Sequence, residues 1–170
     1  HMRTSLSLFV PVALLSCTSN DEITPGNGGG NNGQIPTVFA QISAGDGFTC
    51  GISTHGGLDC WGADIDDLTD APPGRFIDVA AGYFSVCEIA EDGGINCRGD
   101  DQWGRVSAAP TGTYSDLDVG YGHACAVARN GSVECWGLDE HGQADPPDER
   151  FTKVATGRHF SCGLTTAETV

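Results

Sequence analysis

Six cysteines of this chain form three pairs, and in each pair the second cysteine follows the first by ten positions. The pairs are Cys50 and Cys60, Cys87 and Cys97, and Cys125 and Cys135. A tripeptide that ends in glycine lies midway in each pair, as in Arg129-Asn130-Gly131. It fits a three-residue hairpin loop, a type I turn closed by a left-handed glycine that forms a bulge. Counting outward from this loop sets the cysteines opposite each other, in a non-hydrogen-bonded pair with Cα atoms roughly 4.5 Å apart. The spacing therefore predicts three hairpin disulfides.

Other roles for these cysteines stay open, because connectivity cannot be read from spacing alone. They would then be free thiols of the core, or would join neighbouring units. A zinc site is disfavoured, since the sequence has no Cys-x-x-Cys motif and four ligands would have to come from two units. We predict no metal and no cofactor.

Acidic and aromatic side chains provide the other candidate chemistry. The loop acids Asp64-Ile65-Asp66-Asp67 and Asp100-Asp101 lack the spacing of a calcium loop, so we interpret them as solvated. Paired acids that hydrolyse glycosides are the alternative. His123 and Ser85 occupy equivalent positions, and we interpret them as structural groups and not as a base and a nucleophile. We predict no catalytic residue. Five loop side chains are possible ligand-binding groups, because such groups can stack on a sugar or meet a protein: Trp103, Asp100, Asp101, Asp139 and His141.

A repeat of 37 or 38 residues must position these groups. The units are residues 39–75, 76–113 and 114–150, and half a unit follows at 151–170. A fixed period of this size indicates stacked or radial repeats. Within each unit, short apolar runs such as IDVAAG, CEIA and INCRG are bounded by Gly, Pro and Asp, and no window supports a ten-residue helix. The pattern predicts an all-β protein.

The stretch GYGHACAVARNGSVECWGLDEHGQ, residues 120–143, resembles the repeat of the regulator of chromosome condensation family, with Asp139 in place of the usual Asn. The short units look more like those of bacterial relatives, which include secreted inhibitors of β-lactamases. The resemblance covers residue 39 to the end and implies a β-propeller with three full blades and a partial fourth. We expect the Trp after the second cysteine, Trp61 or Trp136, to fill the seam to the next blade. Arg98 replaces this Trp in the second unit, where Trp103 stands at the position of His141.

The number of units is low for a propeller, which usually closes with four to eight blades. Cys162 has no cysteine ten positions on, so we expect it to be unpaired or to form an intermolecular bond. Either the chain is truncated or a second copy completes the ring. Because an open arc exposes edge strands, we predict a homo-oligomer.

Residues 1–17 are interpreted as a signal peptide. An apolar run ends in Leu14-Leu15-Ser16-Cys17, which resembles a bacterial lipobox, and Cys17 would become the acylated residue. A plain secretory peptide is the alternative. His1 precedes Met2, an order that a native start codon would not give, so we interpret His1 as a cloning remnant. Residues 18–37, rich in Gly and Asn, are predicted to be a flexible tether, and residues 38–170 hold the repeats.

Charge and cysteine usage limit the function. The net charge is -15, from 23 acidic and 8 basic side chains, which argues against nucleic acid and allows membrane contact only through a lipid anchor. Disulfides fit an extracytoplasmic protein, an outer-membrane or cell-surface lipoprotein or a secreted one. These features contradict nuclear nucleotide exchange, the activity that the family name suggests. We predict a non-enzymatic recognition or assembly module that binds a protein or glycan through its loops. The alternative is a hydrolase or lyase that uses loop carboxylates.

Overall fold

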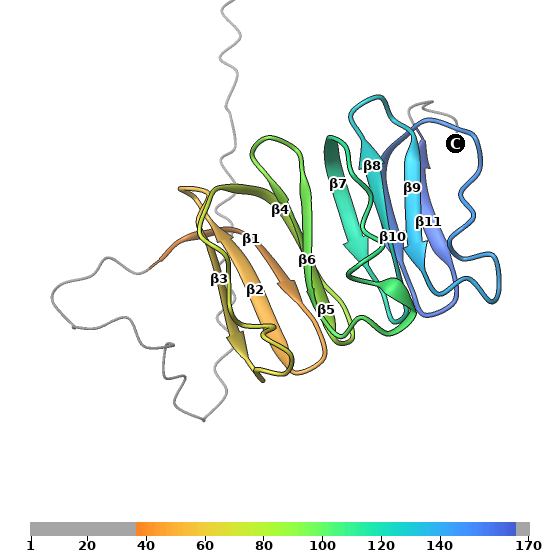
Figure 1. Cartoon of the computed structure of the whole chain (residues 1–170). Coiled ribbons are helices and arrows are strands. Elements are labelled where there is room, and N and C mark those ends of the chain that lie inside the picture. Colours follow the sequence, from red (N-terminus) through yellow and green to blue (C-terminus); the bar gives the residue numbers. More distant parts are fainter. Residues whose placement is uncertain (1–36, 166–170) are drawn as a thin grey trace, which may run out of the picture. The chain divides into compact units, whose positions relative to one another are not determined.

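A computed structural model describes residues 37–165 of the chain. In these residues eleven strands and one 3₁₀ turn, η1 (Gln102–Gly104), form four antiparallel sheets that follow one another in chain order (Figure 1). We call each sheet a blade, and the first blade holds β1 (Phe39–Ala44), β2 (Phe48–Ser53) and β3 (Leu58–Gly62). The second blade holds β4 (Phe76–Ala81), β5 (Ser85–Ala90) and β6 (Ile95–Gly99), and the third holds β7 (Tyr114–Val119), β8 (His123–Ala128) and β9 (Val133–Gly137). The fourth blade has two described strands, β10 (Phe151–Thr156) and β11 (Ser161–Thr165). The predicted all-β fold with three blades and a partial fourth is confirmed. None of the described residues forms a helix that could cross a bilayer.

The hairpin between the second and third strand of each blade has the predicted turn. In the third blade Gly131 N donates to Ala128 O at 2.8 Å and Ala128 N donates to Ser132 O at 2.8 Å, while Gly131 has a φ of 89°. The resulting register sets Cys125 opposite Cys135. All three predicted disulfides are present, with Cα atoms 4.1, 4.1 and 4.0 Å apart, as a non-hydrogen-bonded pair requires.

The first strand of each blade carries a register shift at its second residue. A polar side chain follows the shift in every blade: Gln41, Asp78, Asp116 and Lys153. A bulge of this kind re-aims the side chain that follows it. Here the re-aimed side chains reach the neighbouring blade.

Two of these side chains are carboxylates that join a blade to the next one. Asp78 Oδ2 accepts a hydrogen bond from Leu117 N at 2.9 Å, and Asp116 Oδ2 accepts one from Val154 N at 2.8 Å. Asp78 also accepts from Gln41 Nε2, across the preceding boundary, at 2.5 Å. Burial raises the pKa of Asp78, while the bonds from Gln41 and Leu117 favour its charged form. We call these contacts the carboxylate latches.

The apolar core lies in the seams between blades. One cluster joins the first two blades and includes Ile52, Phe76 and Val79, and a second joins the second and third blades and includes Ile89 and Leu117. Most of the core side chains come from the first two strands of each blade, and Leu58, Leu68 and Trp136 add to them from third strands and a loop.

Replacing Asp78 with Ala is expected to lower the free energy of unfolding by about 2 kcal/mol, because Leu117 N and Gln41 Nε2 lose a buried acceptor. Denaturant unfolding followed by tryptophan fluorescence measures the change. Asp148→Ala, at an exposed position, is the matched control and should change stability by less than about 0.5 kcal/mol. Equal stability of the two variants would contradict a role for the latch.

Candidate recognition site

The loops between the first and second strand of each blade are stacked directly on one another. Asp46 N donates to Gly82 O at 3.2 Å, Tyr83 N to Gly120 O at 3.3 Å, and Tyr121 N to Gly157 O at 3.4 Å. This approach requires glycine, because a Cβ added at Gly120 would lie 2.3 Å from Gly157 O. The residues after these glycines therefore stand in a line across the blades.

Three aromatic side chains and one guanidinium follow this line. The rings of Tyr83 and Tyr121 have centroids 4.8 Å apart, and the guanidinium of Arg158 lies 4.7 Å from the Tyr121 centroid. Trp103, from η1, lies 6.0 Å from Tyr121. Tyr83 and Trp103 are 38% and 39% exposed, so part of each ring faces solvent. We call Tyr83, Tyr121, Trp103 and Arg158 the aromatic row.

Trp103 has a backbone conformation that tryptophan disfavours. Its φ is 65°, in the left-handed region, and the equivalent Asp66 of the first blade has a φ of 52°. Asp tolerates this region, whereas a bulky side chain is costly there. The loop geometry thus does not demand a tryptophan at position 103, and its ring has to be explained by what it contacts.

The side chain of Arg105 lies over the ring of Trp103. Its guanidinium lies 5.3 Å from the Trp103 centroid, donates to Tyr121 O at 2.7 Å and forms an ion pair with Asp100. Arg105 is only 1% exposed. Leu68 and Gln143, the equivalents of Arg105 in the other loops, are buried as well. Trp103 and Asp100, two of the predicted ligand groups, are therefore brought together by a buried arginine.

The other predicted acids serve the loops in which they lie. Asp101 Oδ1 accepts from Val106 N and Ser107 N, both at 2.8 Å, and the bonds from Ser107 lower the pKa of Asp101. Asp139 Oδ1 accepts from Ala144 N at 2.9 Å in the equivalent loop of the third blade. The Asn that the repeat motif usually has at position 139 can play the same role, because its side-chain oxygen is an acceptor at the same distance from the backbone as that of Asp. A role of Asp100, Asp101 and Asp139 in ligand binding stays a prediction.

His141 lies in that same loop of the third blade. Its ring meets the ring of His159 edge to face, with centroids 5.0 Å apart. Its backbone N donates to Gln143 Oε1 at 2.8 Å. His141 thus belongs to the loop next to β11, and its role in binding stays a prediction.

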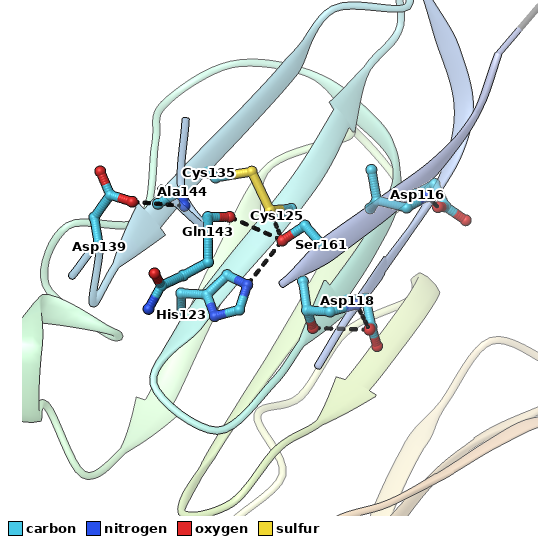
Figure 2. The surroundings of a disulfide bond; sticks show 11 residues. Asp116, Asp118, His123, Cys125, Cys135, Asp139, Gln143, Ala144 and Ser161 are labelled. Carbon is cyan, nitrogen blue, oxygen red and sulfur yellow. Dashed lines mark hydrogen bonds between the residues drawn. A yellow bond between two sulfur atoms is a disulfide. The ribbon is translucent and has the colours of Figure 1, made fainter. Parts of the chain in front are cut away.

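His123 forms a hydrogen-bonded chain that the sequence did not reveal (Figure 2). His123 Nε2 lies 2.8 Å from Ser161 Oγ, and Ser161 Oγ donates to Gln143 O at 2.9 Å. Since the single hydroxyl proton goes to Gln143 O, His123 donates to Ser161 and does not accept from it. Burial lowers the pKa of His123 and keeps its ring neutral. A serine activated by a histidine base would need the opposite direction of donation.

A second buried pair also escaped sequence reasoning. Glu88 Oε2 and Arg98 Nη1 are 2.8 Å apart, and Glu88 is 1% exposed. Desolvation raises the pKa of Glu88 to about 7, against the opposing effect of Arg98. The signal was available, since an acid stands in the middle of a strand that is otherwise mostly apolar and Arg98 stands where other units have Trp. The pair fills the seam between the first two blades.

The position of Trp136 corrects one expectation. Its ring packs in the same cluster as Cys87 and Ile89 of the second blade, and its Nε1 donates to Arg105 O at 2.8 Å. The tryptophan therefore fills the seam to the preceding blade and not to the next one, because residues adjacent to the cysteine on a strand point to the opposite face. Trp61, at the start of the row of blades, lies against Phe39 with centroids 5.4 Å apart.

Comparison with known proteins assigns two segments of the chain to a known type of repeat. Residues 39–64 and 114–143 match the regulator of chromosome condensation (RCC1) repeat. The chain carries RCC1-type repeats. No curated protein matches it. Solved structures that are similar to it in fold include two receptor-kinase ectodomains and a yeast protein.

The CRINKLY WD40 ectodomain of the Arabidopsis thaliana receptor kinase ACR4 has 28% identity and a TM-score of 0.63, over 76% of this chain and 46% of that one. The ectodomain of the Physcomitrella patens receptor kinase CR4 has 25% identity and a TM-score of 0.67, over 81% and 38%. Prp20p of Saccharomyces cerevisiae, with 15% identity and a TM-score of 0.64 over 75% and 41%, shares the fold alone.

The chain thus spans less than half the length of these proteins. Its three disulfides and the likeness to receptor ectodomains indicate an extracytoplasmic location.

The pKa of Glu88 makes stability depend on pH. Native Glu88 keeps its proton up to about pH 7, while the unfolded chain releases it near pH 4.5. The free energy of unfolding should therefore fall as the pH rises from 4.5 to about 7, by up to about 3 kcal/mol. Above pH 7 it should level off. Glu88→Gln should remove this fall. Denaturant unfolding at pH 4.5, 6 and 7.5 checks it, and an identical pH dependence in both proteins would exclude the raised pKa.

Proposed function

We propose that this chain is a non-enzymatic, extracytoplasmic recognition module that binds a partner through the aromatic row. The observation that carries the proposal is the exposure of Trp103, a residue in a disfavoured backbone conformation whose ring lies near the buried guanidinium of Arg105. Unfavourable conformations of this kind concentrate at functional sites.

Between a protein and a glycan, a protein partner has the better support. The row consists of Tyr, Trp and Arg side chains, which are the residue types that dominate binding energy in protein interfaces. Its rings are tilted by about 40° to one another and not coplanar. Such rings suit a contoured protein surface better than one flat sugar chain. The likeness to receptor ectodomains points the same way, as an analogy only.

A hydrolase or lyase that uses loop carboxylates has less support. Asp101 and Asp139 accept backbone N–H groups of their own loops, and Asp100 pairs with Arg105. These contacts fix the three carboxylates in their loops, and the bonds from Ser107 lower the pKa of Asp101.

Two further predictions belong to this function. Acylation of Cys17 lies outside the described residues, and we propose it as the means by which the module is held at a membrane surface. Self-association is supported by apolar side chains at both ends of the row of blades. Ile42 is 59% and Leu164 is 64% exposed, whereas Val79 and Ile89, their equivalents in the second blade, are buried.

Trp103→Ala should weaken binding of the partner at least thirty-fold, since a central interface tryptophan contributes about 2 kcal/mol or more. The measurement uses the full chain in pull-downs of extracellular proteins and on a glycan array, with titration of any hit. Ile77→Ala, an exposed apolar residue of β4, is the control and should leave affinity unchanged. Binding of a glycan that depends on Trp103 would show that the partner is a glycan and not a protein. Hydrolysis of a substrate that is lost in the Asp100→Asn and Asp101→Asn variants would contradict the non-enzymatic role.

A further inference from the structure

A cavity of about 470 Å³ lies beside the Glu88–Arg98 pair, in the seam between the first two blades. The loop from β3 to β4 forms one wall, with Pro72 and Pro73. The β5–β6 hairpin forms the other, with Ala90, Glu88 and Arg98. All the lining residues lie between positions 70 and 98, among the complete blades. We call this cavity the seam pocket.

The next seam holds an indole ring where the first seam has this pocket. In the second seam, Trp136 of β9 belongs to the same apolar cluster as Ala109 and Ala128. The equivalents of these three residues in the first seam all line the pocket: Arg98, Pro72 and Ala90. Walls of this kind therefore accommodate an aromatic ring in this protein, and the volume of the pocket is in the range of small-molecule sites.

Arg98 brings a charge to the seam pocket that the protein balances only in part. Its Nη1 donates to Glu88 Oε2 at 2.8 Å, and its Nη2 lies 3.1 Å from Cys60 Sγ, a weak acceptor. Arg98 Nε is buried and has no hydrogen-bond partner among the described residues. Desolvation raises the pKa of Glu88 to about 7, so below this pH Glu88 is neutral and the guanidinium lacks a countercharge. A largely buried cation in this state favours an anion beside it.

The other charged groups at the pocket leave this preference unchanged. Asp70 and Arg75, from the β3–β4 loop, line the pocket, are exposed and have opposite signs. Arg75 Nε also lies 3.2 Å from Glu91 Oε2. Because these charges lie in water, they are screened more than the buried pair. Arg98 and Glu88 therefore determine which charge the pocket accepts.

We propose that the seam pocket binds a small aromatic carboxylate, whose ring lies between the β3–β4 loop and the β5–β6 hairpin and whose carboxylate pairs with Arg98. A planar guanidinium matches the geometry of a carboxylate. Pro72, Pro73 and Phe76 supply apolar surface for the ring. An anion binds better when Glu88 is protonated, so affinity should fall as the pH rises through 7. This inference does not depend on the aromatic row.

Titration of the full chain with para-fluorophenylacetate, followed by fluorine NMR, tests the proposal. At pH 6 we expect binding with a Kd below about 1 mM. At pH 8 the affinity should be at least five-fold lower, because ionised Glu88 then neutralises Arg98 and repels the ligand. The amide para-fluorophenylacetamide has the same ring without the charge, and it should bind at least ten-fold more weakly than the acid at pH 6.

Two protein variants provide matched controls. Glu88→Ala combined with Arg98→Trp gives the first seam the residues of the second, Ala126 and Trp136, and should abolish binding while the fold is kept. Glu88→Gln is neutral at every pH and should bind the acid equally well at pH 6 and pH 8. This loss of pH dependence distinguishes a ligand at Arg98 from one bound elsewhere.

Three results would overturn the proposal. Binding of the acid to the double variant with unchanged affinity would place the ligand outside the seam pocket. Equal affinity for acid and amide would exclude pairing with Arg98. A Kd above about 10 mM for the acid on the unaltered chain at pH 6 would exclude the site itself. The last two comparisons use the unaltered chain and decide the matter even where the double variant does not fold.

Discussion

The fold depends on a carboxylate that crosses from one sheet to the backbone of the next. Sheets that stand face to face share no ladder hydrogen bonds, so two blades are joined by packing, by side chains that reach across the seam and by backbone bonds between their loops. Asp78 and Asp116 are placed to do so by the bulge that precedes them. Their charge is costly to bury, and the N–H donors from the neighbouring blade offset this cost. Because the donor is a backbone N–H, the latch fixes the position of the first strand of the next blade, whatever side chains that strand carries.

Local geometry could be predicted from the sequence, and contacts between blades could not. The turn at Gly131 fixes the register of its hairpin within a few residues, so the opposition of Cys125 and Cys135 follows from counting. The direction in which Trp136 packs depends on which neighbour lies on which face of the sheet, and this is set by the order of blades in space. Ser161 was missed for the same reason, since only the meeting of β11 with the third blade gives it His123 as a partner.

The candidate site shows a similar division. Loop acids and Trp103 could be selected from the sequence because they break the repeat or stand at its turns. The aromatic row could not, because it forms only when glycine loops of three blades stack. Tyr83 and Tyr121 are 38 positions apart and follow equivalent glycines, so an alignment of the repeats by position after the glycine is the signal that would have found them. The role of Asp139 in closing its own loop likewise needs the path of the backbone.

Each disulfide stays within one hairpin, and this has a mechanical consequence. A pulling force applied to the chain would meet no disulfide between the blades that the structure describes, and would separate these blades one seam at a time. Each disulfide, however, prevents the segment between its two cysteines from extending, and this segment would span about 35 Å if it were fully extended. Under tension, each step of unfolding would therefore lengthen the protein by less than the fully extended length of one repeat, because the disulfide-bonded hairpins stay closed. Reduction would lengthen each step and leave the order of separation unchanged.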